Sequence, residues 1–168
     1  MKIIFDLDET LIYNSHDPKS SLKKFELVYS PRLSDQFMLR PFAREVLCAL
    51  NAKYEVILAS FSTKNRISQV LRVASISDCF SQVFPRESLD PCYRDENTES
   101  SYFIDDFILI DDKGLDDKHT LAKLKFFGSS VEDYSARLLK IPEFRGNDSD
   151  RELLAVLDKV SILTKGIA

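Results

Sequence analysis

The sequence lacks the features that mark several classes of protein. It holds only 3 cysteines, which are scattered and without C-x-x-C spacing (Cys48, Cys79 and Cys92). An odd number of such cysteines fits a reducing compartment, and neither a disulfide framework nor a zinc site. No apolar run approaches the length of a membrane-spanning helix, and no signal-peptide pattern precedes the first predicted strand. We therefore expect a soluble, intracellular, cytoplasmic protein that does not bind membranes.

Positive charge is also scarce. The chain has 23 Lys and Arg against 27 Asp and Glu, a net charge of -4. Binding to phosphate backbones needs a concentrated positive field, so we expect no direct binding of nucleic acids. The sequence contains no internal repeat and no low-complexity tract. With 168 residues and 44% hydrophobic content, it is long enough for one core and short for two, which predicts a single domain over residues 1–168.

Continuous apolar runs alternate along the chain with segments in which apolar residues recur at helical spacing. The runs predict strands over residues 2–6, 55–59, 83–84 and 107–110, and these segments predict helices over 41–51, 64–74 and 120–127, with a last helix after a capping box at Ser149 and Glu152. Such repeated units are typical of a doubly wound α/β fold with a parallel sheet. Its ligand site lies at the carboxyl ends of the strands, where Asp6, Ser60 and Asp111-Asp112 fall.

One segment interrupts this alternation. Residues 25–29 and 37–40 read as two short strands, which predicts a small β-hairpin insertion over about residues 22–40. Residues 85–101 are polar and read as a loop.

The segment Asp6-Leu7-Asp8-Glu9-Thr10 carries the clearest chemical signal. Asp6 and Asp8 stand two residues apart at the end of an apolar strand, so both can face one pocket. Two carboxylates at one place repel each other unless a cation such as Mg2+ lies between them. This pattern favours phosphoryl transfer, in which one carboxylate attacks phosphorus and the other handles the proton of the leaving group.

Three segments together resemble a known superfamily. Asp6 to Thr10 resembles the D-x-D-x-T/V motif of the haloacid dehalogenase (HAD) superfamily, residues 57–60 resemble its second motif, and residues 108–112 resemble its fourth. The hairpin that ends at Arg40-Pro41 and the closing stretch 144–154 are similar to the FCP/SCP group of HAD phosphatases. This resemblance implies a HAD-like, Rossmann-type fold with a hairpin insertion and a minimal cap.

The resemblance also implies roles for individual residues. It implies a nucleophile at Asp6, an acid and base at Asp8 and a phosphate-binding hydroxyl at Ser60. Mg2+ would be bound by Asp6, by the backbone carbonyl of Asp8 and by Asp112. Asp111 would either bind the ion directly or hold one of its ligands in place. Substrate contacts would come from Ser60, Thr10 and Arg40.

The chain departs from the FCP/SCP pattern at one catalytic position. The group carries a lysine, followed by aspartate, ahead of the acidic-pair strand, but this chain has no lysine between Lys64 and Lys113. Arg94, which precedes Asp95, and Lys113 are the two candidates for the missing cation, although a guanidinium is a planar fork and not a point charge.

The residues and the resemblance together favour one function. We expect a Mg2+-dependent phosphomonoester hydrolase that forms a phosphoaspartate and acts on phosphoserine or phosphothreonine of a protein or peptide. One alternative is a small-molecule or nucleotide phosphatase on the same scaffold. The other is a non-catalytic binding module, by analogy with the mitochondrial translocase subunit that resembles this group but serves as a receptor.

Overall fold

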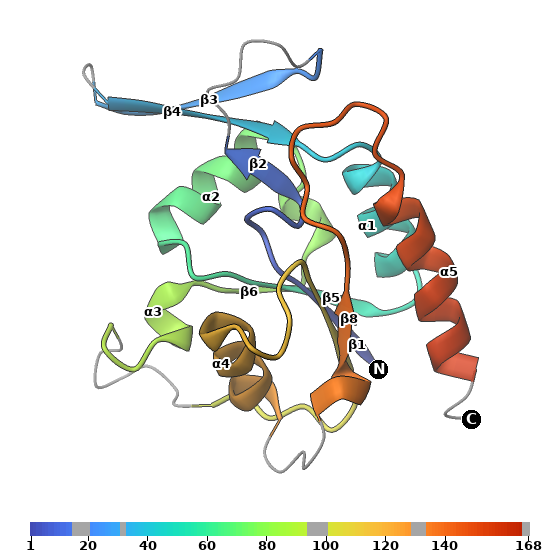
Figure 1. Cartoon of the computed structure of the whole chain (residues 1–168). Helices are drawn as coiled ribbons and strands as arrows, with labels where there is room; N and C mark the ends of the chain where they lie inside the picture. Colours follow the sequence, from blue (N-terminus) through green and yellow to red (C-terminus); the bar gives the residue numbers. More distant parts are fainter. Residues whose placement is uncertain (15–20, 31–32, 94–100, 129–133, 166–168) are drawn as a thin grey trace.

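A five-stranded parallel sheet forms the centre of the protein. The computed structural model describes residues 1–14, 21–30, 33–93, 101–128 and 134–165. The strand order is β6-β5-β1-β7-β8 (Figure 1). The bounds of the strands are β1 Lys2–Phe5, β5 Glu55–Ala59, β6 Gln82–Phe84, β7 Phe107–Asp111 and β8 Leu138–Lys140. This order confirms the doubly wound fold that the alternating pattern predicts, because neighbours in the sheet are reached by crossovers.

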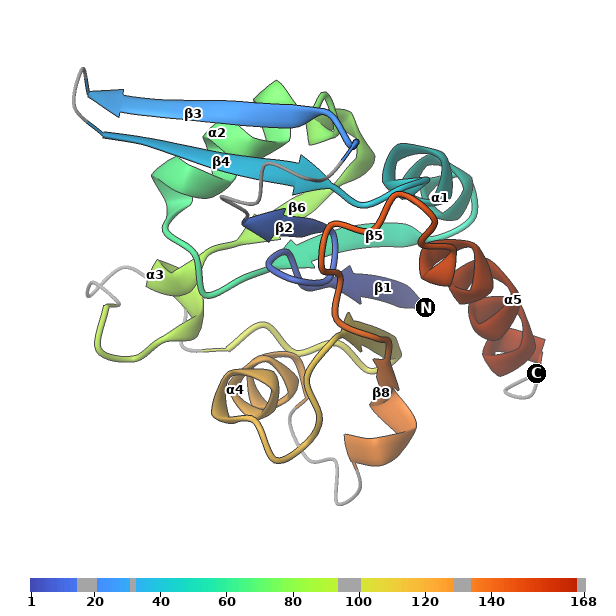
Figure 2. The same cartoon turned by 45° about the horizontal axis from the view of Figure 1, so that its top comes forward.

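Helices cover both faces of the sheet. On one face lie α1 (Ala43–Asn51), α2 (Lys64–Val73) and α5 (Glu152–Lys165), and on the other lie α3 (Arg86–Leu89) and α4 (Lys118–Phe127). Strand β1 shows why both faces are apolar, since Ile3 and Phe5 join the core under α1, α2 and α5, while Ile4 joins the core under α3 and α4. Figure 2 shows the sheet between α4 and α2. No helix in the described part of the chain combines the length and apolarity that a membrane span requires.

The predicted hairpin insertion is confirmed, with one additional strand. Strands β3 (Lys24–Ser30) and β4 (Leu33–Leu39) pair antiparallel, and β2 (Ile12–Asn14) pairs with the other edge of β4. The three-stranded sheet passes over α2 (Figure 2). Strand β2 was not predicted because three residues are too few to show an alternation of apolar and polar side chains.

Several boundaries differ from the predicted ones. Helix α1 begins at Ala43 and not at Pro41, because Phe42 has φ 63°, in the left-handed region. The predicted loop 85–101 contains the short helix α3 in its described part. Strand β8 was also missed. It is a three-residue edge strand that follows the 3-10 turn η2 (Tyr134–Arg137), and two of its residues are only half-buried.

The capping box predicted at the start of the last helix is wrong, because Ser149 and Glu152 make other hydrogen bonds. The Ser149 hydroxyl bonds Asp148, and the backbone N–H of Glu152 donates to Asp150 Oδ1 at 3.0 Å. Asp150 therefore caps α5, while its carboxylate also binds Arg40. The same carboxylate thus joins the start of α5 to a buried arginine 110 residues away, which the local S-x-x-E spacing does not reveal.

Candidate active site

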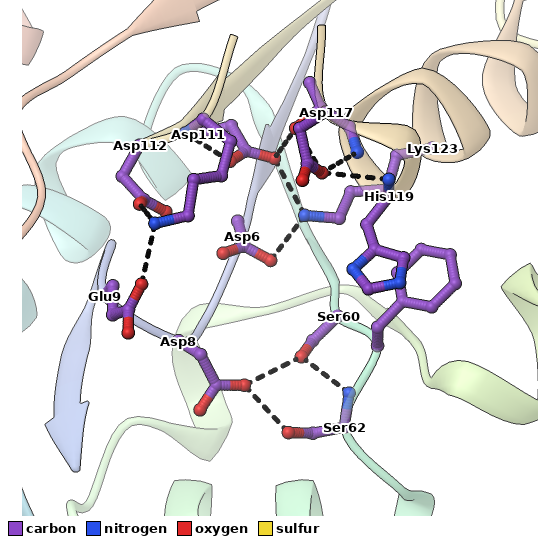
Figure 3. A pocket seen from close by; sticks show the side chains of 13 residues that line it. Asp6, Asp8, Glu9, Ser60, Ser62, Asp111, Asp112, Asp117, His119 and Lys123 are labelled. Carbon is purple, nitrogen blue, oxygen red and sulfur yellow. Dashed lines mark hydrogen bonds and ion pairs between the residues drawn. The ribbon is translucent and has the colours of Figure 1, made fainter.

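The carboxyl ends of three neighbouring strands bring the predicted residues together. Phe5 of β1 is in register with Leu58 of β5 and Ile110 of β7, so the chain continues from each strand into the same edge. A pocket of about 240 Å³ lies there (Figure 3). Its lining is Asp6, Asp8, Glu9, Ser60, Phe61, Ser62, Asp111, Asp112, Lys113, Asp117, His119, Thr120 and Lys123.

A buried lysine links two carboxylates on the inner side of this pocket. The ammonium of Lys123 lies 2.5 Å from Asp6 Oδ1 and 2.8 Å from Asp111 Oδ2 (Figure 3). The side chain of Lys123 is only 4% exposed. Burial would lower the pKa of Lys123, but the attraction of the two carboxylates outweighs it, so the pKa is raised and the group stays charged. Burial raises the pKa of Asp6 to about 7, with Lys123 opposing the shift.

The Asp111 carboxylate is fully occupied by protein donors. Its Oδ1 accepts from the backbone N–H of Lys113, and its Oδ2 accepts from Lys123 and from the Thr120 hydroxyl. Thr120 and Lys123 both come from α4, which Asp117 caps by accepting from the backbone N–H groups of residues 119 and 120. Asp111 therefore positions the lysine.

Asp112 is held by the aspartate motif. The hydroxyl of Thr10 donates to Asp112 Oδ1 at 3.2 Å and accepts from the Asp112 backbone N–H at 3.1 Å. The other oxygen, Oδ2, is buried and has no partner with hydrogen-bond geometry. Burial raises the pKa of Asp112, while the neighbouring Lys113 opposes the shift. A buried carboxylate oxygen requires a cation beside it, because desolvation of an unpaired charge is costly.

A second lysine lies at the rim, on the other side of Asp112. Lys113 Nζ lies 2.7 Å from Asp112 Oδ2 and donates a hydrogen bond of 2.8 Å to Glu9 Oε2. These two acidic partners raise the pKa of Lys113. The prediction that Lys113 replaces the missing lysine gains no support from this arrangement, because its ammonium pairs with Asp112 and Glu9, whereas Asp6 pairs with Lys123.

Asp8 lies at the opposite rim among polar donors. Its Oδ2 accepts from the hydroxyls of Ser62 at 2.7 Å and Ser60 at 3.4 Å (Figure 3). Its Oδ1 accepts from Asn14 at 3.0 Å and lies 2.9 Å from a guanidinium nitrogen of Arg66. Arg66 comes from the first turn of α2, whose N-cap is Thr63. The donors on Asp8 thus come from β2, α2 and the loop after β5.

An aromatic pair forms the wall nearest to α4. The rings of Phe61 and His119 are stacked, with centroids 4.2 Å apart and planes 22° apart (Figure 3). His119 precedes Lys123 by four residues on α4, so both point to the same side of the helix. The exposed imidazole therefore lies at the mouth of the pocket, above the buried ammonium.

Two residues predicted to contact substrate lie elsewhere. Thr10 is fully buried behind Asp112, and the Arg40 side chain is also buried. The Arg40 guanidinium donates to Asp150, to the carbonyl of Thr10 and to that of Pro142. Neither residue lines the pocket. Both hold the aspartate motif in place, and a direct contact with substrate has no support in this structure.

Lys123 is not among the residues that the sequence predicts for the site, and Arg94, which is, lies outside the described residues. A signal for Lys123 exists in the sequence. Positions 120, 123, 124 and 127 form the buried stripe of α4, and 123 is the one charged side chain among them. A lysine in an apolar stripe is rarely buried unless it is paired, so its position indicates anionic partners.

The acidic residues form a set that can hold a divalent cation. Asp6, Asp111 and Asp112 each place a carboxylate oxygen within 4.8 Å of the others. All the donors are carboxylate oxygens, which hard cations such as Mg2+ prefer. Asp111 already accepts three hydrogen bonds, whereas Asp112 Oδ2 accepts none, so Asp6 and Asp112 are the better placed of the three to bind Mg2+.

Comparison with known proteins points to one family. The model for NLI interacting factor-like phosphatases matches residues 1–166. A search of curated proteins gives no match. Two solved structures of Fcp1, an RNA polymerase II CTD phosphatase, share the fold and so support the HAD-like architecture. A fission yeast variant bound to beryllium fluoride has a TM-score of 0.50 and 18% identity, over 97% of this chain and 50% of its own. The second has a TM-score of 0.53 and 16% identity, over 97% and 48%. This chain therefore spans about half of either structure.

Proposed function

The chain belongs to the NLI interacting factor-like phosphatase family, and we propose that it removes phosphate from serine or threonine side chains of a protein or peptide. The observation that carries the proposal is the buried contact of Asp6 with Lys123 inside a pocket rimmed by Asp8 and Ser60. A nucleophilic carboxylate, a fixed cation and a second carboxylate are the parts that phosphomonoester hydrolysis through an enzyme-bound phosphate requires. We also propose that residues 1–168 form one domain, because both cores share one sheet.

Asp6 acts as the nucleophile in this mechanism. Its carboxylate attacks phosphorus, the bond to the substrate oxygen breaks, and a phosphoaspartate forms. Asp8 gives a proton to the departing serine or threonine oxygen. It then takes a proton from the water that attacks the phosphoaspartate, which releases inorganic phosphate and restores the Asp6 carboxylate and the protonated form of Asp8.

Lys123 is proposed to replace the lysine that precedes the acidic pair in related phosphatases. Its ammonium contacts Asp6 directly, so it lies where negative charge gathers when a phosphate approaches. The low exposure of Lys123 strengthens this electrostatic effect, since the local dielectric constant is reduced. Asp111 and Thr120 keep the lysine in place before the substrate arrives.

Asp6, Asp112 and the backbone carbonyl of Asp8 are proposed to hold Mg2+. When bound, the cation neutralises part of the charge on the phosphoryl oxygens and offsets the repulsion between phosphate and carboxylates. Thr10 fixes Asp112 through two hydrogen bonds, which involve Oδ1 and the backbone N–H and leave Oδ2 as the oxygen that can bind the cation. The Ser60 hydroxyl accepts from the backbone N–H of Ser62, and its own proton can turn to a phosphoryl oxygen.

The size of the pocket favours a side-chain phosphate as substrate. Pockets that enclose small ligands usually measure ~300 to 1,000 Å³, whereas this one measures about 240 Å³. It has room for a phosphoryl group and the end of a side chain, and the rest of the substrate stays outside. The Fcp1 structures carry the name of a CTD phosphatase, which agrees with a protein substrate.

The receptor alternative loses support in this structure. The binding module rests on analogy with the mitochondrial translocase subunit, and the missing lysine before the acidic pair keeps it possible, whereas Lys123 supplies an ammonium at the nucleophile and argues against it. A phosphatase for small molecules or nucleotides remains the alternative that activity measurements must separate.

A matched substrate screen tests the proposal. Turnover would be measured on phosphoserine and phosphothreonine peptides, on sugar phosphates and nucleotides, and on p-nitrophenyl phosphate, each with Mg2+ and with excess EDTA. We expect Mg2+-dependent release of phosphate, fastest from the peptides. Full activity in EDTA would contradict the metal site, and a clear preference for metabolites would contradict the substrate class.

A further inference from the structure

The ammonium of Lys113 lies against the same Asp112 oxygen that the proposed metal site would use. Its Nζ lies 2.7 Å from Asp112 Oδ2. That oxygen has no partner with hydrogen-bond geometry, although the Asp112 side chain is only 1% exposed. The contact is therefore a short ion pair without the geometry of a hydrogen bond.

Asp112 belongs to two acidic groups at once. One consists of Asp6, Asp111 and Asp112, and the other of Glu9, Asp112 and Glu143. Within each group the carboxylate oxygens lie within 4.8 Å of one another. The ammonium of Lys113 pairs with both Glu9 and Asp112, so in this structure it neutralises Asp112.

The two lysines differ in how firmly they are held. Lys123 is 4% exposed, whereas the Lys113 side chain is 43% exposed. Lys113 also has a second partner, since it donates to Glu9 Oε2 at 2.8 Å, and the Glu9 side chain is 38% exposed. The ammonium can therefore leave Asp112 and remain paired with Glu9, without entering a region that lacks charge or water.

We propose that Lys113 is a displaceable cation that competes with Mg2+ for Asp112 and so sets the affinity for the metal. In the metal-free protein the ammonium neutralises the buried carboxylate of Asp112. When Mg2+ binds, Lys113 withdraws to Glu9. The inference rests on the metal site of the proposed function, and it adds a role for two residues of this chain, Lys113 and Glu9, to that site.

The direct test is calorimetric titration of the substrate-free protein with MgCl2. Lys113→Met removes the competing charge and keeps most of the side-chain volume, so we expect Mg2+ to bind about fivefold more tightly, the upper end for a partly exposed ion pair. Lys113→Arg keeps the charge and should bind Mg2+ within about twofold of the parent. Lys118→Met is the matched control, because Lys118 is exposed at the start of α4 and does not line this pocket.

A double-mutant cycle separates competition from a general change in charge. Glu9→Gln removes the partner to which Lys113 withdraws, so it should weaken Mg2+ binding several-fold in the parent. In the Lys113→Met background the same substitution should have little effect. If Glu9→Gln weakens binding equally in both backgrounds, Glu9 acts only through its charge, and the proposed displacement is wrong.

Thermal melting without Mg2+ gives a second readout. Lys113→Met should melt at a lower temperature than the parent in EDTA and gain more from saturating Mg2+, because Asp112 loses its neutralising partner. Equal Mg2+ affinity in parent and Lys113→Met would overturn the inference while leaving the metal site intact. No detectable Mg2+ binding by the parent would overturn the metal site and the inference together.

Discussion

The inner side of the pocket and its rim hold charge in different ways. At the inner side, Lys123 is almost completely buried between Asp6 and Asp111, and Thr120 completes the hydrogen bonds of Asp111. At the rim, Asp8 is about one third exposed and its partner Arg66 about one sixth. A buried charge in a fixed position acts strongly on its neighbours, because the local dielectric constant is low. Water screens the interaction between charges at the rim. The comparison predicts that the effects of substitution decrease from the inner side outward.

The nucleophile should give the largest effect. Asp6→Asn keeps the shape of the side chain but removes the carboxylate that attacks phosphorus, so we expect no measurable turnover of any phosphomonoester. Melting temperature would be measured beside activity, to show that the fold persists. Asp158→Asn, an exposed change of the same kind on α5, is the control and should leave turnover unchanged. If Asp6→Asn kept the parental activity, Asp6 would not be the nucleophile, and the expected decrease of effects from the inner side of the pocket to its rim would have no basis.

Lys123→Met should give the next largest effect. Loss of the ammonium should lower kcat by a factor that corresponds to about 2.7 to 4 kcal/mol, by analogy with the loss of one oxyanion donor. The variant should also melt at a lower temperature, since two buried carboxylates lose their cation. The assay would use saturating Mg2+ at a temperature where the variant is folded.

Lys125→Met is the matched control for this substitution, because Lys125 is exposed on the same helix. We expect parental kcat and melting temperature from it. If Lys123→Met loses stability but keeps kcat within about threefold of the parent, the lysine is structural, and the inner side of the pocket does not control the rate.

The sequence predicts the part of the site that follows from strand order. Asp6, Ser60, Asp111 and Asp112 come together because three parallel strands end at one edge, and an apolar run followed by a polar residue marks each of these ends. Lys123 escaped prediction because its position depends on how α4 packs against the sheet. Arg40 was misjudged for a related reason, since its partner Asp150 lies 110 residues away and only the fold brings the two together.

Arg66→Met tests the rim, where we expect a moderate effect that depends on the substrate. Arg66 pairs with Asp8 at 2.9 Å and donates to the Ser62 hydroxyl at 2.6 Å, so it positions the proposed acid. Rates on an alkyl phosphate such as phosphoserine peptide should fall about tenfold, a fraction of the full ~10²- to 10⁴-fold effect of a general acid. Rates on p-nitrophenyl phosphate should fall much less, because p-nitrophenolate leaves without a proton.

Arg66→Lys and Asp8→Asn complete the test of the rim. The lysine variant keeps one charge and should recover part of the rate on the peptide. Asp8→Asn should show the same dependence on leaving group more strongly. A uniform loss on both substrates in Arg66→Met would mean that Arg66 supports the fold and does not position Asp8.

Arg94→Ala should have the smallest effect of the series. Arg94 precedes the acidic pair as the lysine of related phosphatases does, and on sequence grounds it is a candidate for the cation. Lys123 already contacts Asp6 at 2.5 Å, so we expect a second cation at the nucleophile to add little to the rate. We expect kcat at saturating Mg2+ to stay within about twofold to threefold of the parent. The informative comparison is with Lys123→Met in the same assay. A loss of similar size in Arg94→Ala would show that the two cations act together on the phosphoryl group. A larger loss would show that Arg94, and not Lys123, replaces the lysine of related phosphatases.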